Sequence, residues 1–305
     1  MAKSKMLLNV EKISELVGHK ASIYELNNAA QPNIIYSGSI DKQIIQWDLS
    51  TFQPTNFYIN LPETIYSIVH DIERKTIYVG SQSGKIYFID LTAKKEFKVL
   101  FHHSQAIFSL KQIKDKLIAA SADGSISVVN LNTYTLTYKK VMCVEKVRAI
   151  DYKNQLLAIA CGDGSIRILD SETLTEIQTI SAHQLSCNAV KFHPNSRYLV
   201  SGGRDAHLRI WDINSNFSLV KEIAAHNFAI YSIDFSNNAT LFATASRDKT
   251  VKLWNAETFD ILIRINKEKL DGHTNSVNKV LWSSFNNYLI SAGDDKKIMI
   301  WKVSN

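Results

Sequence analysis

The segment Arg209-Ile210-Trp211-Asp212 decides the fold, because related segments recur along the chain. Three copies keep the tryptophan, namely Ile45-Gln46-Trp47-Asp48, Lys252-Leu253-Trp254-Asn255 and Met299-Ile300-Trp301-Lys302. Three weaker copies replace the indole by an aliphatic residue, namely Phe88-Ile89-Asp90, Val128-Val129-Asn130 and Ile168-Leu169-Asp170. Successive copies are separated by 42, 40, 40, 42, 43 and 47 residues. A regular period of this length is the signature of a repeat architecture, and seven units fill the 305 residues.

Each unit contains four short β-rich runs separated by Pro, Gly, Asn, Asp and Ser. In the fifth unit the runs are 188–192, 198–201, 207–211 and 219–223. A four-stranded sheet cannot bury both faces alone, but sheets repeated around an axis bury their faces against one another. We therefore predict an all-β fold, a seven-bladed β-propeller with four antiparallel strands in each blade.

The repeats leave no room for a second domain, so we predict one propeller over residues 1–305. The approximate bounds of the repeats are 18–60, 61–101, 102–141, 142–181, 182–224, 225–270 and 271–305. Only four residues follow Trp301, so the last repeat lacks an outer strand, whereas the segment 10–17 precedes the first repeat with nothing to pair with. We predict that residues 1–17 supply the outer strand of the last blade and so close the ring.

Polar residues recur in step with the tryptophan position. An aspartate lies six residues before that position in six units, at Asp41, Asp123, Asp163, Asp205, Asp248 and Asp295. A histidine lies 22 residues before the aspartate in four units, at His19, His183, His226 and His273, and His103 lies 20 residues before Asp123. A hydroxyl residue lies four residues before the aspartate at Ser37, Ser201, Thr244 and Ser291.

This pattern resembles the WD-repeat family over essentially the whole chain. The resemblance implies that the histidine, the aspartate, the hydroxyl residue and the tryptophans Trp47, Trp211, Trp254 and Trp301 form buried hydrogen-bonded tetrads. Because one network repeats around a ring, we interpret it as structural, not catalytic. In the second unit Leu61 and Ser83 stand at the histidine and aspartate places, and the fourth unit has no histidine near that place. We expect these two blades to depend on apolar packing instead.

The histidine-bearing links and the aspartate-bearing turns should lie on one face of the ring, where the innermost strands begin. Ten residues are expected to surround the mouth of the channel on that face, and we call them the histidine-side rim: Tyr24, Tyr66, Phe108, Arg148, Asn188, Tyr231, Asn278, Arg204, Arg247 and Asp294. Large rings and guanidinium groups dominate the binding energy of many interfaces. Equivalent positions often contact peptides in the WD-repeat family, so the resemblance implies that this rim recruits protein or peptide partners.

Composition limits the alternatives to this non-catalytic scaffold. With 45% hydrophobic and 21% charged residues the chain is globular, not disordered. Aromatic rings beside arginine could also form a stacking platform for single-stranded RNA, so an RNA-binding propeller stays open as the alternative function. The net charge of +6 is modest and scattered, however, and we do not expect a nucleic-acid partner.

Catalysis has the least support in the sequence. The chain contains no GxSxG, HExxH or GxxxxGK[ST] motif, although residues from several blades could still meet in the channel. We expect no cofactor and no metal, and we interpret Cys143, Cys161 and Cys187 as small buried hydrophobic residues. No signal peptide or membrane-spanning run is recognisable, so we expect a soluble, cytoplasmic propeller that is monomeric within a complex.

Overall fold

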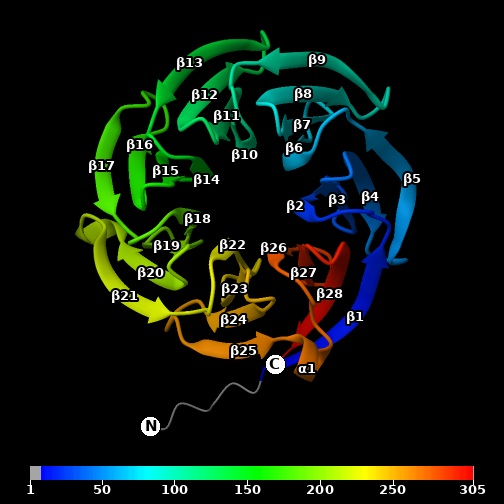
Figure 1. Cartoon of the computed structure of the whole chain (residues 1–305), viewed down its shortest axis with the longest axis vertical. Helices are drawn as coiled ribbons and strands as arrows, with labels where there is room; N and C mark the ends of the chain where they lie inside the picture. Colours follow the sequence, from blue (N-terminus) through cyan, green and yellow to red (C-terminus); the bar gives the residue numbers. More distant parts are fainter. Residues whose placement is uncertain (1–7, 305) are drawn as a thin grey trace.

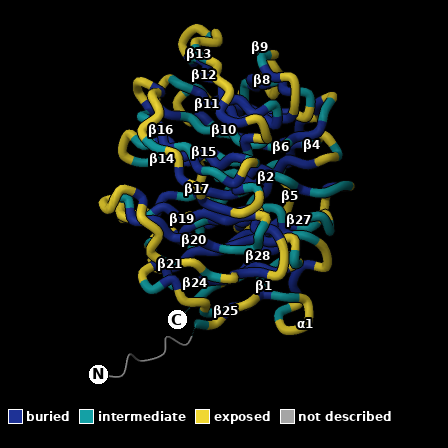
Figure 2. The backbone as a smooth tube through the Cα atoms, turned by 60° about the vertical axis from the view of Figure 1, so that its left-hand side comes forward, coloured by how far each residue is buried: buried dark blue, intermediate teal, exposed yellow. Residues whose placement is uncertain are grey.

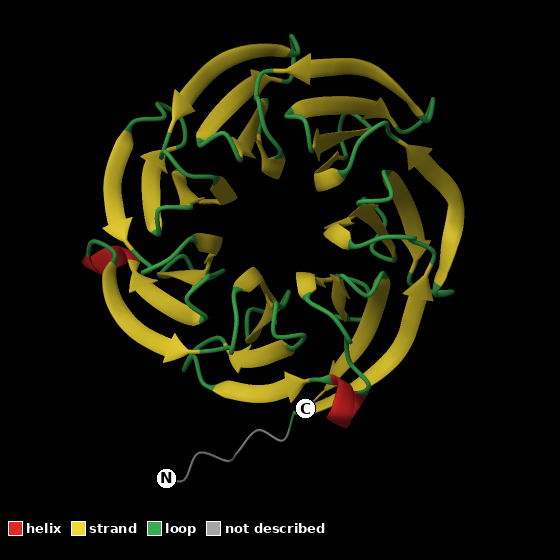
Figure 3. Cartoon of the chain, in the orientation of Figure 1, coloured by secondary structure: helices red, strands yellow, loops and turns green. Residues whose placement is uncertain are grey.

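The computed structural model describes residues 8–304, which form seven four-stranded antiparallel sheets arranged as a ring (Figure 1). The innermost strands of the ring line a central channel. The predicted seven-bladed propeller is therefore confirmed. Strands provide nearly all of the regular structure (Figure 3). Within residues 8–304 the helical segments are α1 (Lys267–Leu270) and a 3-10 turn (Ile213–Ser215), both of which connect strands.

Blades one to six follow the chain outward, so that the first strand of each blade lies against the channel and the fourth lies at the outside (Figure 1). The strands of blades one to three are β2 (Ile23–Asn28), β3 (Ile34–Ser39), β4 (Gln43–Asp48), β5 (Gln53–Asn60), β6 (Ile65–Asp71), β7 (Thr76–Ser81), β8 (Lys85–Asp90), β9 (Lys95–Phe101), β10 (Ile107–Ile113), β11 (Lys116–Ser121), β12 (Ser125–Asn130) and β13 (Thr135–Val141).

The next three blades repeat the same order of strands. They consist of β14 (Val147–Lys153), β15 (Leu156–Cys161), β16 (Ser165–Asp170), β17 (Glu176–Ser181), β18 (Cys187–Phe192), β19 (Tyr198–Gly203), β20 (His207–Asp212), β21 (Ser218–Ala224), β22 (Ile230–Phe235), β23 (Leu241–Ser246), β24 (Val251–Asn255) and β25 (Ile261–Ile265).

Blade seven joins the two ends of the described chain. Its inner strands are β26 (Val277–Trp282), β27 (Leu289–Gly293) and β28 (Lys297–Ser304), and its outer strand is β1 (Asn9–Val17). β1 runs antiparallel to β28, with Asn9 opposite Ser304 and Val17 opposite Lys297. The predicted closure of the ring by the N-terminal strand is therefore confirmed. Residues 1–7 of the predicted closing segment and residue 305 of the predicted last repeat lie outside the described residues.

The apolar core lies between the blades. Figure 2 shows buried residues along the strands and exposed residues concentrated in the turns. Ile210 of blade five packs in one cluster with Phe242 and Trp254 of blade six. Leu16 of the closing strand packs with Trp47 of blade one and Ile298 of blade seven. Each sheet therefore buries its faces against its two neighbours, and the closing strand contributes to the core between the last and the first blade.

The turn between the second and third strands has the same backbone in every blade. The residue after the aspartate position has a positive φ throughout, at Lys42, Gly84, Gly124, Gly164, Ala206, Lys249 and Lys296. A Cβ at Gly124 would lie 2.2 Å from the carbonyl oxygen of Cys143, so the turn of blade three requires glycine, whereas four other blades have lysine or alanine at this position. The turn also directs the backbone N–H two residues after the aspartate toward the carboxylate, as Thr250 does toward Asp248 at 3.0 Å.

Candidate functional site

Hydrogen bonds join the histidine, the aspartate, the hydroxyl residue and the tryptophan in blades one, five, six and seven. Histidine Nδ1 lies 2.9 to 3.0 Å from the aspartate, and Nε2 lies 2.6 to 2.9 Å from the hydroxyl oxygen. The indole N–H donates to the same hydroxyl oxygen at 2.7 to 3.0 Å. The four sets are His19, Ser37, Asp41 and Trp47; His183, Ser201, Asp205 and Trp211; His226, Thr244, Asp248 and Trp254; and His273, Ser291, Asp295 and Trp301.

In two of these sets, those of His183 and His226, the electrostatics favour a neutral histidine beside a charged carboxylate. Burial lowers the pKa of His183 and His226, so the imidazoles hold no extra proton at neutral pH. Burial alone would raise the pKa of Asp205, but hydrogen bonds from His183 and Arg209 outweigh it and hold that pKa below its usual range. Both ring nitrogens of each histidine already have partners. These histidines are therefore placed to hold the turn against the inner link, not to exchange protons with a substrate.

Blade three contains a variant of the network. His103 Nδ1 lies 3.0 Å from Asp123, but its Nε2 lies 2.8 Å from the hydroxyl of Ser127 on the third strand. Ala119 occupies the usual hydroxyl place, and Val129 replaces the tryptophan. Sequence reasoning missed Ser127, although an alanine at the expected hydroxyl place signals that another group must meet Nε2.

Blade two does not depend on apolar packing alone, so that expectation was wrong. Leu61 is buried among apolar side chains, but Glu63, two residues later, extends a carboxylate from the inner link to the turn between β7 and β8. This carboxylate accepts hydrogen bonds from Ser81 Oγ (2.9 Å), Ser83 N (3.1 Å), Lys85 Nζ (2.6 Å) and Tyr87 OH (3.1 Å). Burial would raise the pKa of Glu63, but these donors lower it to about 2. A polar network therefore persists without the histidine.

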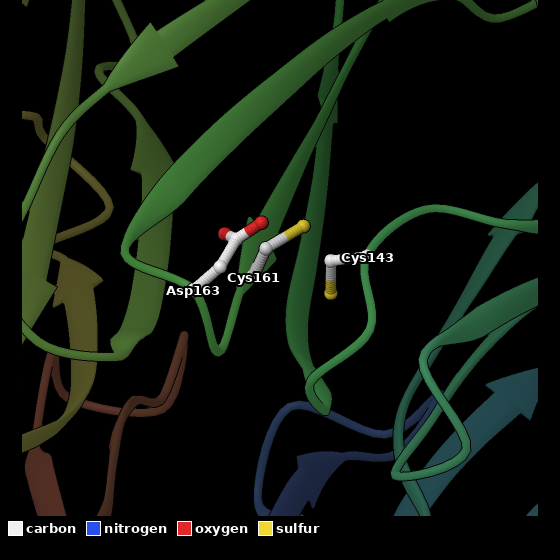
Figure 4. Close-up of side chains that lie close together, drawn as sticks. All are labelled: Cys143, Cys161 and Asp163. Carbon is white, nitrogen blue, oxygen red and sulfur yellow. The ribbon is translucent and has the colours of Figure 1, made fainter.

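Blade four lacks the buried tetrad, and the prediction that Asp163 belongs to one was wrong. Asp163 is exposed, and its carboxylate binds the hydroxyl of Ser165 at 2.6 Å. Within residues 8–304 no histidine is hydrogen-bonded to it, because Cys143 stands at the position that His103 takes in blade three. Figure 4 shows Cys161 and Asp163 at the end of β15 and in the following turn, with Cys143 on the neighbouring link.

The cysteines of blade four lie closer to each other than their separation in sequence indicates. The thiols of Cys143 and Cys161 and the carboxylate of Asp163 lie within 4.8 Å of one another. Two thiols and a carboxylate are donors that zinc accepts, but the Arg167 guanidinium lies 3.7 Å from the carboxylate and competes with any cation. All three cysteines of the chain are free and buried. We therefore describe this cluster as a packed thiol pair, and assign no metal to it.

The seven innermost rim positions line the central channel, a cavity of about 860 Å³. Four of them, from consecutive blades, form a continuous row at its mouth. The rings of Tyr24 and Tyr66 stack at 5.0 Å, Tyr66 meets Phe108 edge to face at 5.3 Å, and the Arg148 guanidinium lies 4.9 Å from the centroid of the Phe108 ring. We call these four residues the aromatic row. Their mutual contacts fix the rings before any partner arrives.

The other side of the mouth is more polar. Asn278 donates to Asp294 at 2.8 Å, and Asn188 donates to the carbonyl of Ile230 at 3.2 Å. Arg204, Arg247 and Tyr231 line a second cavity of about 320 Å³ together with Arg148, Asn188, Phe228 and Ala229. Phe228 was not among the residues predicted from sequence. It lies two residues after His226 with 57% of its surface exposed, and an exposed phenylalanine on a histidine-side link is a signal that sequence reasoning could have used.

Inside the channel, carboxylates are neutralised by lysines of other blades. Three ion pairs cross between blades, namely Glu25 with Lys279 at 2.9 Å, Asp151 with Lys111 at 2.7 Å and Asp234 with Lys191 at 2.9 Å. The Asp151 carboxylate also accepts the backbone N–H of Phe192 at 2.8 Å. Carboxylates held in this way tie the inner strands together and are poorly placed to serve as general acids or bases.

The repeats match a known family. The family described as "WD domain, G-beta repeat" matches residues 10–48, 174–212, 217–255 and 265–302, which together make up about half of the chain. The chain belongs to the WD-repeat family. The resemblance stated from the sequence is thus confirmed, and the WD-repeat match includes residues 10–17 of the closing strand as well as all four complete tetrads.

Several known proteins are similar to this chain over part of their length. The chain is 27% identical over 158 residues to WD repeat-containing protein SL1-17 of Schistosoma mansoni, covering 50% of this chain and 52% of that protein. It is 24% identical over 217 residues to the striatin homolog of Dictyostelium discoideum, covering 63% of this chain and 26% of that protein. Pre-mRNA-processing factor 17 of Homo sapiens is 22% identical over 191 residues, covering 59% of this chain and 33% of that protein. The chain therefore spans from about a quarter to about half of the length of these relatives.

The WD-repeat chain has no helix within residues 8–304 that is long and apolar enough to cross a membrane.

Proposed function

We propose that this WD-repeat protein recruits a protein or peptide partner on its histidine-side rim and carries out no chemical step. The observation that carries this proposal is the aromatic row, which presents four preordered side chains at the open mouth of the channel. Large planar groups that are already fixed lose little conformational entropy on binding, and each can bury much apolar area. Phenolic hydroxyls and a guanidinium at the same place add directional hydrogen bonds.

The charge distribution supports binding over catalysis. The tetrad histidines have both nitrogens occupied, and three channel carboxylates are paired with lysines. A surface that offers aromatic and arginine side chains but few free acids or bases suits recognition.

A capture experiment tests this function. The double variant Tyr24→Ala, Tyr66→Ala removes the stacked pair of the aromatic row. The matched control Tyr58→Ala removes a tyrosine that is 65% exposed on the outer strand β5. After equal folding is established by circular dichroism and thermal unfolding, each protein is used to capture partners from a lysate of its native cells.

We expect the wild type and Tyr58→Ala to retain the same specific partner and the double variant to lose it. Equal capture by all three proteins would show that the partner binds another surface of the propeller, and the proposal would be wrong. An intracellular location and a monomeric propeller within a complex also stay predictions, which imaging of the tagged protein and its native mass would test.

Binding of single-stranded RNA is the second candidate, because arginines adjoin aromatic rings at the rim. It has weaker support, since Tyr24 and Tyr66 stack on each other and so cover the faces that bases would need. RNA affinity should fall steeply between low and physiological salt, whereas peptide affinity based on aromatic burial should change little.

A further inference from the structure

Three arginines converge on one small cavity beside the channel mouth. The cavity of about 320 Å³ is lined by Arg148, Asn188, Arg204, Phe228, Ala229, Tyr231 and Arg247, and we call it the arginine pocket. Blades four, five and six contribute one arginine each. No aspartate or glutamate is among these lining residues, so the pocket concentrates positive charge in a chain whose basic residues are otherwise scattered.

These arginines differ from four of the other five in the protein because they lack carboxylate partners. Arg74, Arg167, Arg197 and Arg209 each form an ion pair with an aspartate or a glutamate. In the part of the chain that the structure describes, none of the three pocket arginines lies within ion-pair distance of an acidic side chain. Three guanidinium groups that face one cavity without counter-charges repel one another, and an anion would relieve that repulsion.

Contacts with aromatic rings hold two of these guanidinium groups in place. Arg148 lies 4.9 Å from the centroid of Phe108, and Arg247 lies 5.9 Å from the centroid of Phe228. The Nε atom of Arg148 is buried and has no hydrogen-bond partner within residues 8–304. Burial and the nearby Arg204 both lower the pKa of Arg148, as expected for a cation without a counter-ion. A buried donor without a partner points to an acceptor that comes from outside the chain.

We propose that the arginine pocket binds the phosphate group of a phosphorylated side chain in the peptide partner. This inference rests on the proposed function and deepens it, because it names the chemical group that the rim recognises. A phosphate monoester carries a charge of about −1.5 to −2 at neutral pH and has three strong acceptor oxygens. Guanidinium groups match it with bidentate hydrogen bonds. A single carboxylate would offer fewer acceptors and would neutralise less of the positive charge.

The shape of the site favours a phosphopeptide over RNA. A chain of nucleotides needs a basic groove that follows several phosphates and open aromatic faces for successive bases. Here three arginines without ion pairs face one small pocket, and Asn278 and Asp294 of the adjacent blade seven bring a carboxylate to the mouth. The adjacent aromatic row could hold the residues that flank the phosphorylated one.

Immobilised degenerate peptide libraries test the proposal directly. The central residue of each library is phosphoserine, phosphothreonine, unmodified serine or glutamate. The variants Arg204→Gln and Arg247→Gln remove one pocket arginine each, and Arg264→Gln is the control because it removes an exposed arginine on the outer strand β25. Each variant must first show the thermal unfolding midpoint of the wild type.

We expect the wild type and Arg264→Gln to be retained on the phosphorylated libraries and released by inorganic phosphate. Each pocket variant should bind them about tenfold more weakly, since each loses one charge-assisted hydrogen bond to the phosphate, at about 1.4 kcal/mol for a tenfold change. Equal retention on phosphorylated and unmodified libraries would overturn the inference. Undiminished phosphopeptide binding by both pocket variants would overturn it as well.

Two further outcomes separate this inference from the proposed function. In the first outcome, the aromatic-row variant does not capture the cellular partner, but the Arg204→Gln protein does, and the wild type still binds the partner after phosphatase treatment. The rim function would then be supported and the phosphate site would be wrong. A polyuridine oligonucleotide provides the other comparison. If it binds the wild type tightly but neither pocket variant, and does not release the protein from the phosphopeptide libraries, the pocket is an RNA site and the inference is wrong.

Discussion

At the scale of single residues, the turn aspartate connects separate parts of a blade through its side chain. Asp248 accepts hydrogen bonds from His226 Nδ1 at 2.9 Å, from Asn227 N at 3.1 Å and from the hydroxyl of Thr250 at 2.6 Å. It therefore joins the inner link to the turn between the second and third strands. Asp163 occupies the same place in blade four but is exposed and lacks the histidine.

This difference gives a matched pair of substitutions. Asp248→Ala should lower the free energy of unfolding by about 1 to 3 kcal/mol, because it leaves buried donors without an acceptor. Asp163→Ala should change it by less than about 0.5 kcal/mol, as is usual for exposed positions. Urea unfolding followed by circular dichroism measures both. Equal losses for the two variants would show that the buried network adds nothing to stability.

The same residues predict how stability depends on pH. Burial lowers the pKa of His103, His183 and His226 below the usual 6.5, so the unfolded state takes up protons first as the pH falls. Hydrogen bonds hold the pKa of Asp205 and Asp248 below the usual 3.8, against the effect of burial, and these residues act in the same direction at lower pH.

Stability contributed by both groups is therefore lost on acidification. We expect the thermal unfolding midpoint to be constant above about pH 7, to fall from about pH 6.5 to 5, and to fall again below about pH 4. Scanning calorimetry across this range provides the measurement. A midpoint that stays level from pH 7.5 to 5 would contradict the assignment of neutral, buried histidines.

Spacing in the sequence was enough to place the histidines beside their aspartates, but not to find every member of a network. A repeat pattern identifies residues at equivalent positions of successive repeats. It therefore missed Ser127 and Glu63, whose side chains join these networks from other positions of the repeat. For the same reason it assigned Asp163 to a tetrad that lacks its histidine. Whether a polar residue is buried depends on its neighbours in space, and only the folded blade shows those.

At the scale of elements, the closing strand has the largest effect on the integrity of the ring. β1 pairs with β28 along its length, and Leu16 is 2% exposed in the core that blade seven shares with blade one. Sequence alone predicted this closure, because the last repeat lacked a strand and the first was preceded by an extra one. The position of the bulge between Lys12 and Ser14 depends on register and was not predictable.

Removal of this strand should open the ring. A chain that begins at residue 18 exposes the edge of β28, and an unpaired edge promotes association between molecules. We expect a lower thermal unfolding midpoint and aggregation in size-exclusion chromatography. A truncated protein that is monomeric and as heat-stable as the wild type would disprove the structural role of the strand.

Two point variants isolate the packing contribution of the same strand. Leu16→Ala should cost about 2 to 5 kcal/mol, because it leaves a cavity between two blades. Val17→Ala, at a neighbouring side chain that is 66% exposed, should cost less than about 0.5 kcal/mol. The two midpoints in urea give the comparison, and a similar loss at both positions would argue against burial as the cause.

At the scale of the whole molecule, the ring brings residues from all seven repeats to one mouth. The period of the repeats, the direction of the strands and the place of the inner strand together predicted which side chains would line the channel. The grouping of three arginines into one pocket was not predicted, because it depends on the rotation between neighbouring blades and on side-chain conformation. The ion pairs inside the channel escaped prediction for the same reason.

Site-specific photo-crosslinking tests the binding rim most directly. A photoreactive amino acid is placed at Tyr231 on the histidine-side rim or at Ile72, which is 60% exposed at the other end of the channel. We predict that the protein with the probe at residue 231 crosslinks its cellular partner and that the protein with the probe at residue 72 does not. Crosslinking from residue 72 alone would contradict the rim as the binding surface.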